Sequence, residues 1–141
     1  RDLTSPSIAT LENILEALGT NLKDFFSEDE DEQIVFSKDD FFENTQDDYK
    51  ISYIIPNAQK NEMEPIMITI KPGGQYIEEE PHEGEEFGYV LAGTIILHLG
   101  KKKYKVKKGE SFYYKAKVNH FIENTGKSPA KVIWVSTPPS F

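Results

Sequence analysis

Apolar positions near the start of the chain repeat with the period of a helix. They recur at offsets of three and four and so form one stripe on a helix predicted over residues 5–18: Ile8, Leu11, Ile14, Leu15 and Leu18. Pro6 suits the first turn and Gly19 suits the C-terminal cap. Asn21 can cap a second, short helix over residues 22–26.

From Gln33 onward the pattern changes to short β-rich runs, separated by turn residues such as Pro72-Gly73-Gly74. The expected strands cover residues 34–36, 50–55, 65–71, 87–91, 94–99, 103–106, 111–114, 120–123 and 131–136. Many short strands with no helical pattern between them are typical of a sandwich or barrel. We therefore predict a mainly β fold behind a small helical segment.

Alternation within the strands predicts which side chains face inward. Phe112 and Tyr114 fall on one face of their strand and Tyr113 on the other. Tyr104 and Val106 alternate with lysines, which predicts an antiparallel strand with its apolar side chains inward. We interpret the lysines as a solvent-facing edge rather than as a patch for an anionic ligand.

Charge is distributed unevenly along the chain. Residues 1–50 hold 4 Lys and Arg against 14 Asp and Glu, whereas residues 51–141 hold 12 against 10. The acidic run over residues 27–32 is typical of a solvated linker. Because phosphate contacts need clustered Lys and Arg, we expect no DNA binding through this chain itself.

Composition limits the class of protein further. The chain has no cysteine, which excludes disulfides and thiolate zinc sites and fits a cytoplasmic location. It has no long apolar run, so we expect no membrane partner. Since residue 1 is Arg1 rather than Met, we expect a fragment or a processed form.

Two histidines and a carboxylate are the candidate metal ligands. His82 and Glu86 would lie about 13 Å apart on a straight strand, too far to share an ion. Gly84 between them permits a bend, and His120 arrives from a later strand. Such a set can hold Zn, Ni, Mn or Fe, with Glu80 as a fourth ligand. The alternative is a polar pocket that binds a ligand without metal.

The same residues fall into two spaced motifs. The first pattern, G-x5-H-x-H-x3–4-E-x6-G, is matched by Gly74, Glu80 in place of the first histidine, His82, Glu86 and Gly93. The second, G-x5-P-x-G-x2-H-x3-N, is matched by Gly109, His120 and Asn124, with Lys115 and Lys117 replacing its proline and second glycine. Over residues 65–136 the chain thus resembles the cupin family, which implies a cupin double-stranded β-helix, or jelly-roll, barrel.

The helical segment has a resemblance of its own. Residues 5–26 resemble the closing helices of a lambda-repressor-like (XRE) helix-turn-helix domain. We therefore expect residues 1–30 to be the end of such a domain plus the acidic linker, truncated within the DNA-binding domain. Residues 31–141 are then expected to form a cupin sensor domain.

Together the resemblances imply the effector-sensing part of a bacterial transcription regulator. A small molecule would bind in the barrel, and DNA would bind through other parts of the full-length protein. The protein would be a homodimer, in which two DNA-binding domains are paired. Expected ligand-binding residues are Glu80, His82, Glu86, Tyr89, Phe112, Tyr114 and His120. We expect no catalytic activity; the alternative is a metal-dependent cupin enzyme, a dioxygenase or an isomerase.

Overall fold

The computed structural model describes residues 8–17 and 33–141. The chain divides into two compact units, Arg1–Val35 and Phe36–Phe141. The first unit contains α1 (Ile8–Ala17), within the predicted helix. The short helix expected over residues 22–26, the acidic linker and the domain boundary expected after residue 30 lie outside the described residues.

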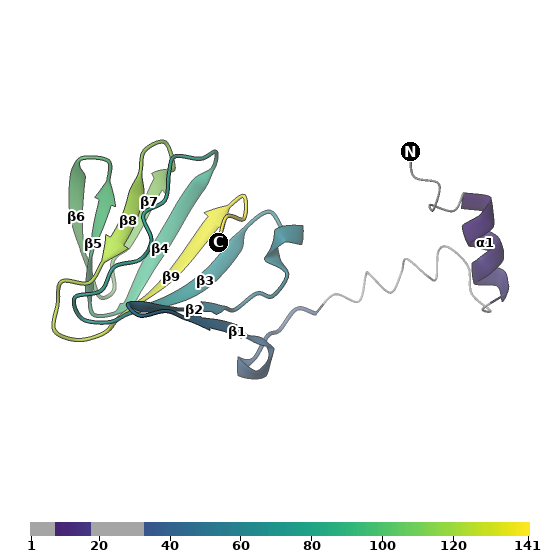
Figure 1. The fold of residues 1–141 in the computed structure, drawn as a ribbon, viewed down its shortest axis with the longest axis horizontal. Coiled ribbons are helices and arrows are strands. Elements are labelled where there is room, and N and C mark those ends of the chain that lie inside the picture. Colours follow the sequence, from purple (N-terminus) through teal and green to yellow (C-terminus); the bar gives the residue numbers. More distant parts are fainter. Residues whose placement is uncertain (1–7, 18–32) are drawn as a thin grey trace. The chain divides into compact units, whose positions relative to one another are not determined.

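The second unit is built from antiparallel strands in two sheets (Figure 1). One sheet has six strands in the order β1-β2-β3-β9-β4-β7, and the other has three in the order β6-β5-β8. The strands are β1 (Phe42–Thr45), β2 (Tyr49–Tyr53), β3 (Glu64–Ile70), β4 (Glu85–Ala92), β5 (Thr94–Leu99), β6 (Lys102–Lys107), β7 (Ser111–Lys115), β8 (His120–Glu123) and β9 (Ala130–Thr137). The prediction of a mainly β fold is confirmed.

Two differences from the predicted strands fall in the sequence where the first unit ends and the second begins. Residues 34–36 form no strand, and Ile34 and Val35 are exposed. Instead β1 forms at the edge of the six-stranded sheet, paired with β2. All four of its side chains are exposed, so its sequence carries no alternation of apolar and polar positions that could have revealed it.

The core lies between the two sheets, where alternate side chains of most strands point inward. In β3 and β9 every second residue is buried, as expected for sheets with one solvated face. Trp134 is completely buried and contacts Phe112 and Tyr76 edge to face. The predicted inward position of Tyr104 is wrong: its strand is at an edge, and this side chain is 44% exposed.

A short 3-10 turn, Lys38–Asp40, precedes β1, and a second, Ala58–Lys60, lies between β2 and β3. Among the residues that the structure describes, no helix has the length and apolar character needed to cross a membrane.

Candidate metal centre

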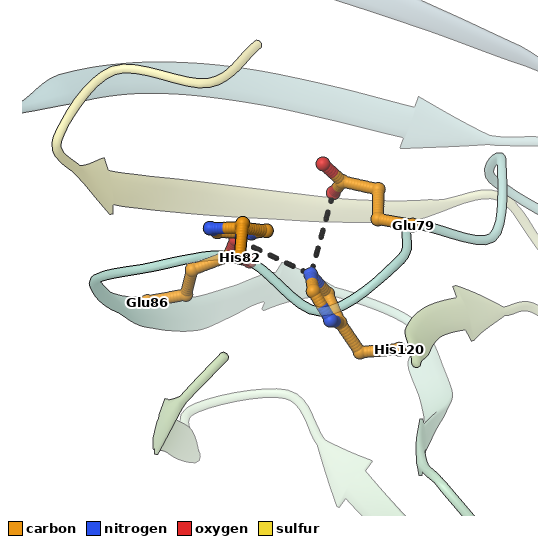
Figure 2. A group of neighbouring side chains, drawn as sticks. All are labelled: Glu79, His82, Glu86 and His120. Carbon is orange, nitrogen blue, oxygen red and sulfur yellow. Dashed lines mark hydrogen bonds and ion pairs between the residues drawn. The ribbon is translucent and has the colours of Figure 1, made fainter. Parts of the chain in front are cut away.

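Four side chains meet at the end of the sandwich where β4 and β8 begin (Figure 2). Glu86 is the second residue of β4 and points into the barrel, where it is buried. His120, the first residue of β8, is also buried and faces it. Glu79 and His82 come from the segment that precedes β4. The first residues of two strands therefore position Glu86 and His120, and the segment before β4 positions Glu79 and His82.

Gly84 makes the turn that brings His82 back over Glu86. Its φ is +113°, a conformation that L side chains rarely adopt. A Cβ at this position would lie 2.0 Å from the Thr137 carbonyl oxygen. Only glycine therefore allows the turn to pass so close to the end of β9. The expected bend at Gly84 is present.

The possible ligand atoms of the four residues lie within 4.8 Å of one another. His82 Nε2 is 2.8 Å from Glu86 Oε2, and His120 Nε2 is 3.3 Å from the same oxygen. His120 Nε2 also lies 3.7 Å from Glu79 Oε1. These separations are close to those of ligands that share one transition-metal ion at about 2.0–2.2 Å.

Backbone carbonyls orient both imidazoles. His82 Nδ1 lies 2.9 Å from the Glu83 carbonyl oxygen, and His120 Nδ1 lies 2.9 Å from that of Val118. A carbonyl only accepts, so Nδ1–H is the donor in each pair. In the neutral rings, Nε2 then carries the lone pair and points at the other members of the cluster. This arrangement is typical of metal-binding histidines.

Tyr114 holds the central carboxylate from the opposite side. Its hydroxyl donates to Glu86 Oε1 over 2.6 Å, which leaves Oε2 facing the two imidazoles. Burial raises the pKa of Tyr114, and the charge of Glu86 raises it further, so the phenol stays protonated as a donor. Tyr114 would thus orient the Glu86 carboxylate toward any ion that it binds.

Burial and neighbouring charges shift the pKa values of Glu79 and Glu86 in opposite directions. Burial and the charge of Glu86 raise the pKa of Glu79 to about 7. Burial also raises the pKa of Glu86, but the contacts from His120 and Tyr114 outweigh it, so this pKa is lowered. Burial lowers the pKa of His120, but the neighbouring Glu86 carboxylate and the Val118 carbonyl outweigh it and raise this pKa overall.

These residues fit a divalent transition metal. Two imidazole nitrogens and two carboxylate oxygens form a donor set suited to Zn, Ni, Mn or Fe. His120 Nε2 and Glu79 Oε1 are buried without a hydrogen-bond partner. Buried polar atoms are costly when unpaired, so an ion at this point would satisfy both.

The expected ligand Glu80 does not join the cluster; Glu79 occupies that place. Glu79 and His120 form an antiparallel bridge and exchange backbone hydrogen bonds. Cross-strand partners project to the same side, so Glu79 faces the cluster and its neighbour Glu80 is exposed. The motif spacing had pointed to the wrong one of three consecutive glutamates.

Two aromatic residues expected to bind ligand also lie elsewhere. Tyr89 stands on the outer face of β4, because it is an odd number of positions from inward-facing Glu86. Phe112 is buried over Gly88, where a Cβ would lie 2.1 Å from its ring, and it packs in the core. Tyr114 is the aromatic residue of the expected set that contacts the cluster.

Solvent reaches the cluster past His82. This side chain is partly exposed and borders a surface hollow of about 600 Å³ formed with Pro81, Gly84, Lys115 and Lys117. The other three clustered residues do not line that hollow. His82 is therefore the member of the cluster that borders this hollow.

Comparison with known proteins agrees with this geometry. The family model described as Cupin domain matches residues 66–136. The chain belongs to the cupin family. Over 144 aligned residues this cupin is 31% identical to the HTH-type transcriptional regulator PuuR of Escherichia coli, an alignment that covers the whole chain and 78% of the regulator. The match extends through the helical segment as well as the sandwich.

Solved structures share the cupin fold. The cupin domain of an XRE family transcriptional regulator from Enterobacter cloacae has a TM-score of 0.58 and 16% identity, covering 65% of this chain and 98% of that one. A predicted oxalate decarboxylase from Thermotoga maritima has a TM-score of 0.65 and 18% identity, covering 74% and 98%. The structure of Fe(II) HppE has a TM-score of 0.64 and 21% identity, covering 92% and 76%.

Proposed function

We propose that this cupin is the effector-sensing part of a bacterial transcription regulator and that a small molecule binds at the cluster of Glu79, His82, Glu86 and His120. The observation that carries the proposal is this half-buried cluster, in which Glu79 Oε1 and His120 Nε2 have no hydrogen-bond partner. The whole chain is homologous to a regulator. Groups arranged in this way are typical of a ligand site.

A divalent metal is part of the proposed site. Glu79, His82, Glu86 and His120 would hold it. When bound, it would supply a Lewis acid that anchors an oxygen or nitrogen of the effector. Tyr114 keeps Glu86 ionised and aimed at the imidazoles, and the Glu83 and Val118 carbonyls keep both Nε2 atoms available.

The effector is expected to be small. Beyond the cluster the interior is filled by fully or nearly fully buried side chains, among them Trp134, Tyr76 and Phe112. A hollow of about 600 Å³ borders the cluster at His82, and we place the effector there.

The proposed regulator would act as a cytoplasmic homodimer. DNA would bind through a helix-turn-helix segment of the complete regulator rather than through the sandwich. The two DNA-binding domains of the dimer would exist in two arrangements. The effector would shift the equilibrium toward the arrangement that it binds more tightly.

Metal analysis of the purified chain tests the site. We expect about one divalent ion per chain after incubation with Zn²⁺, Ni²⁺, Mn²⁺ or Fe²⁺ and desalting. Glu86→Gln and His120→Ala should each lower the affinity about tenfold to a hundredfold. His98→Ala is the matched control, because His98 pairs with Glu123 outside the cluster. Equal metal binding by all four proteins would reject the site.

A DNA-binding measurement tests the regulatory part. The complete regulator should bind its own promoter with an affinity that changes between its metal-loaded and metal-free forms. Glu86→Gln should abolish the difference without unfolding the protein. If neither the metal nor this substitution changes the affinity for the promoter, the result would count against a sensing role.

A cupin enzyme is the second candidate, because the same four residues could hold iron. Stoichiometric Fe²⁺ with oxygen consumption on addition of candidate substrates would favour an enzyme. Metal-dependent DNA binding with no turnover would favour the sensor.

A further inference from the structure

A second hollow lies beside β1, β2 and the first residue of β3. β1 and β2 form the edge of the six-stranded sheet that is away from β5 and β6 (Figure 1). The hollow has a volume of about 400 Å³. We call it the aromatic hollow, because its lining includes three rings and one carboxylate: Phe42, Tyr53, Phe141 and Glu64. These four residues belong neither to the cluster at the candidate metal centre nor to the hollow beside His82.

Glu64 brings a buried carboxylate to the aromatic hollow. It alternates along β3 with the buried residues Ile66, Ile68 and Ile70, so its side chain points to the inner face of the sheet. Glu64 is only 2% exposed. Its Oε1 accepts the Phe141 N–H over 2.9 Å. Within the residues that the structure describes, no other hydrogen bond or ion pair reaches this carboxylate.

The fold alone does not explain why residue 64 carries a charge. One backbone N–H needs only one acceptor oxygen, which a glutamine would offer equally well. A buried carboxylate is costly unless an opposite charge or several hydrogen bonds compensate it. Among the described residues that line the aromatic hollow, none has a basic side chain. The compensating cation is therefore expected to come from outside the chain.

The three rings supply the rest of a cation site. Phe42 and Tyr53 are cross-strand partners on β1 and β2, and their ring centroids are 6.1 Å apart. The Phe141 ring packs edge to face on that of buried Trp134 at 5.5 Å, which holds it in place. Burial raises the pKa of Tyr53, and the charge of Glu64 raises it further, so the phenol stays neutral. The negative face of an aromatic ring attracts a cation.

The aromatic hollow is distinct from the candidate metal centre. Glu64, Ser136 and Glu86 lie in one row across β3, β9 and β4, because Ser136 pairs with both glutamates. Adjacent strands lie about 4.8 Å apart, so the backbones of the two glutamates are about 10 Å apart. Ser136 is fully buried between them, and its hydroxyl contacts the Pro138 carbonyl oxygen and the Ser140 hydroxyl. The two carboxylates therefore belong to separate sites.

We propose that the aromatic hollow binds a small organic ammonium ion, whose N–H groups donate to Glu64 and whose carbon atoms contact the three rings. The buried carboxylate selects a positive charge, and the rings favour an organic ion over a hydrated metal ion. A volume of about 400 Å³ is in the range of small-molecule sites. This inference goes beyond the proposed function and depends neither on the metal nor on the regulatory role.

Titration with three probes of similar size tests the preference for charge. Benzylammonium is positive, benzyl alcohol is neutral and benzoate is negative, and all three carry the same ring. Each is added to the chelator-treated full chain and followed by the amide chemical shifts in NMR spectra. Benzylammonium should bind at least about tenfold more tightly than benzyl alcohol, because hydrogen bonds between charged groups are the stronger ones. The shifts should change around residues 53–59 and 64.

Two substitutions and a control test the assignment to these residues. Glu64→Gln keeps an acceptor for the Phe141 N–H but removes the charge, so it should abolish the preference for benzylammonium over benzyl alcohol. Phe42→Leu, at a ring that is 67% exposed, should fold normally and weaken benzylammonium binding about twofold to fivefold. Glu62→Gln is the matched control, because it removes the same charge from an exposed side chain outside the aromatic hollow. It should bind all three probes like wild type.

Three results would overturn the inference. They are equal binding of the charged and neutral probes by the wild-type chain, an unchanged preference in a folded Glu64→Gln chain, and shifts centred on residues 79–86 and 120 instead. Thermal unfolding shows whether each variant is folded. If Glu64→Gln does not fold, benzylammonium binding that Phe42→Leu leaves unchanged would also overturn it.

Metal content is measured on the same proteins. Absence of metal binding with an intact preference for benzylammonium would count against the proposed function alone. Metal binding without that preference would count against the aromatic hollow alone.

Discussion

At the scale of the residue, Glu86 is the centre of the candidate site, since both imidazoles and Tyr114 converge on its carboxylate. His82, Glu86 and His120 could be proposed from the sequence, because a motif and a glycine bend pointed to them. Glu79 could not, because Glu78, Glu79 and Glu80 are chemically identical neighbours. Only the bridge between Glu79 and His120 decides which of them faces inward.

Removing one hydroxyl should weaken metal binding. Tyr114→Phe takes away the donor to Glu86 Oε1, so the Glu86 pKa should rise and metal affinity should fall about tenfold. The unpaired carboxylate oxygen should also cost about 1–3 kcal/mol of unfolding free energy. Titration with Zn²⁺ and urea unfolding measure the two effects. Tyr113→Phe, on the exposed face of the same strand, should change neither.

At the scale of the element, the turn before β4 is what assembles the site. Alternation and turn residues predicted eight of the nine strands, because those strands have one buried face. They failed for β1, whose side chains are all exposed, and for residues 34–36, which are apolar but have no strand beside them. The order of strands in each sheet could not be predicted from the sequence either. Strands such as β3 and β9 pair although they are far apart in the chain, and local patterns do not indicate such pairs.

Two glycine substitutions separate the cost of backbone strain from the cost of a steric clash. Gly84→Ala and Gly73→Ala both place a side chain at positive φ, which costs about 1–3 kcal/mol. Only at residue 84 would the new Cβ also meet Thr137; nothing lies within 4 Å at residue 73. We expect Gly84→Ala to be the more destabilising by at least about 1 kcal/mol in urea unfolding, and it alone should lose metal. Equal losses would remove Gly84 from its proposed role.

At the scale of the whole molecule, the cluster makes stability depend on pH. Stability should fall with rising pH in the metal-free chain and rise with pH in the metal-loaded chain. In the metal-free chain the pKa values of Glu79 and His120 are both raised above their ordinary values. A raised pKa means that the folded chain binds protons more tightly than the unfolded chain, so stability is lost as pH rises through the raised values. Metal binding requires the deprotonated groups and so strengthens as pH rises.

The melting temperature should therefore respond to pH in two ways. After chelation it should fall between pH 6 and pH 8, and Glu79→Gln should flatten the decline. With Zn²⁺ in excess over the chain it should rise across the same interval. Parallel curves for the two states would show that these groups do not share one ion.

The alternation along β4 has a consequence for signalling. Glu86 points into the cluster, whereas its covalent neighbours Glu85 and Phe87 point to the opposite side of the sheet. A single peptide unit on either side of Glu86 thus separates the cluster from the solvent-facing side of β4. Linkage is reciprocal, so whatever a ligand at the cluster does to the affinity of a partner on the outer face, that partner does equally to the affinity of the ligand.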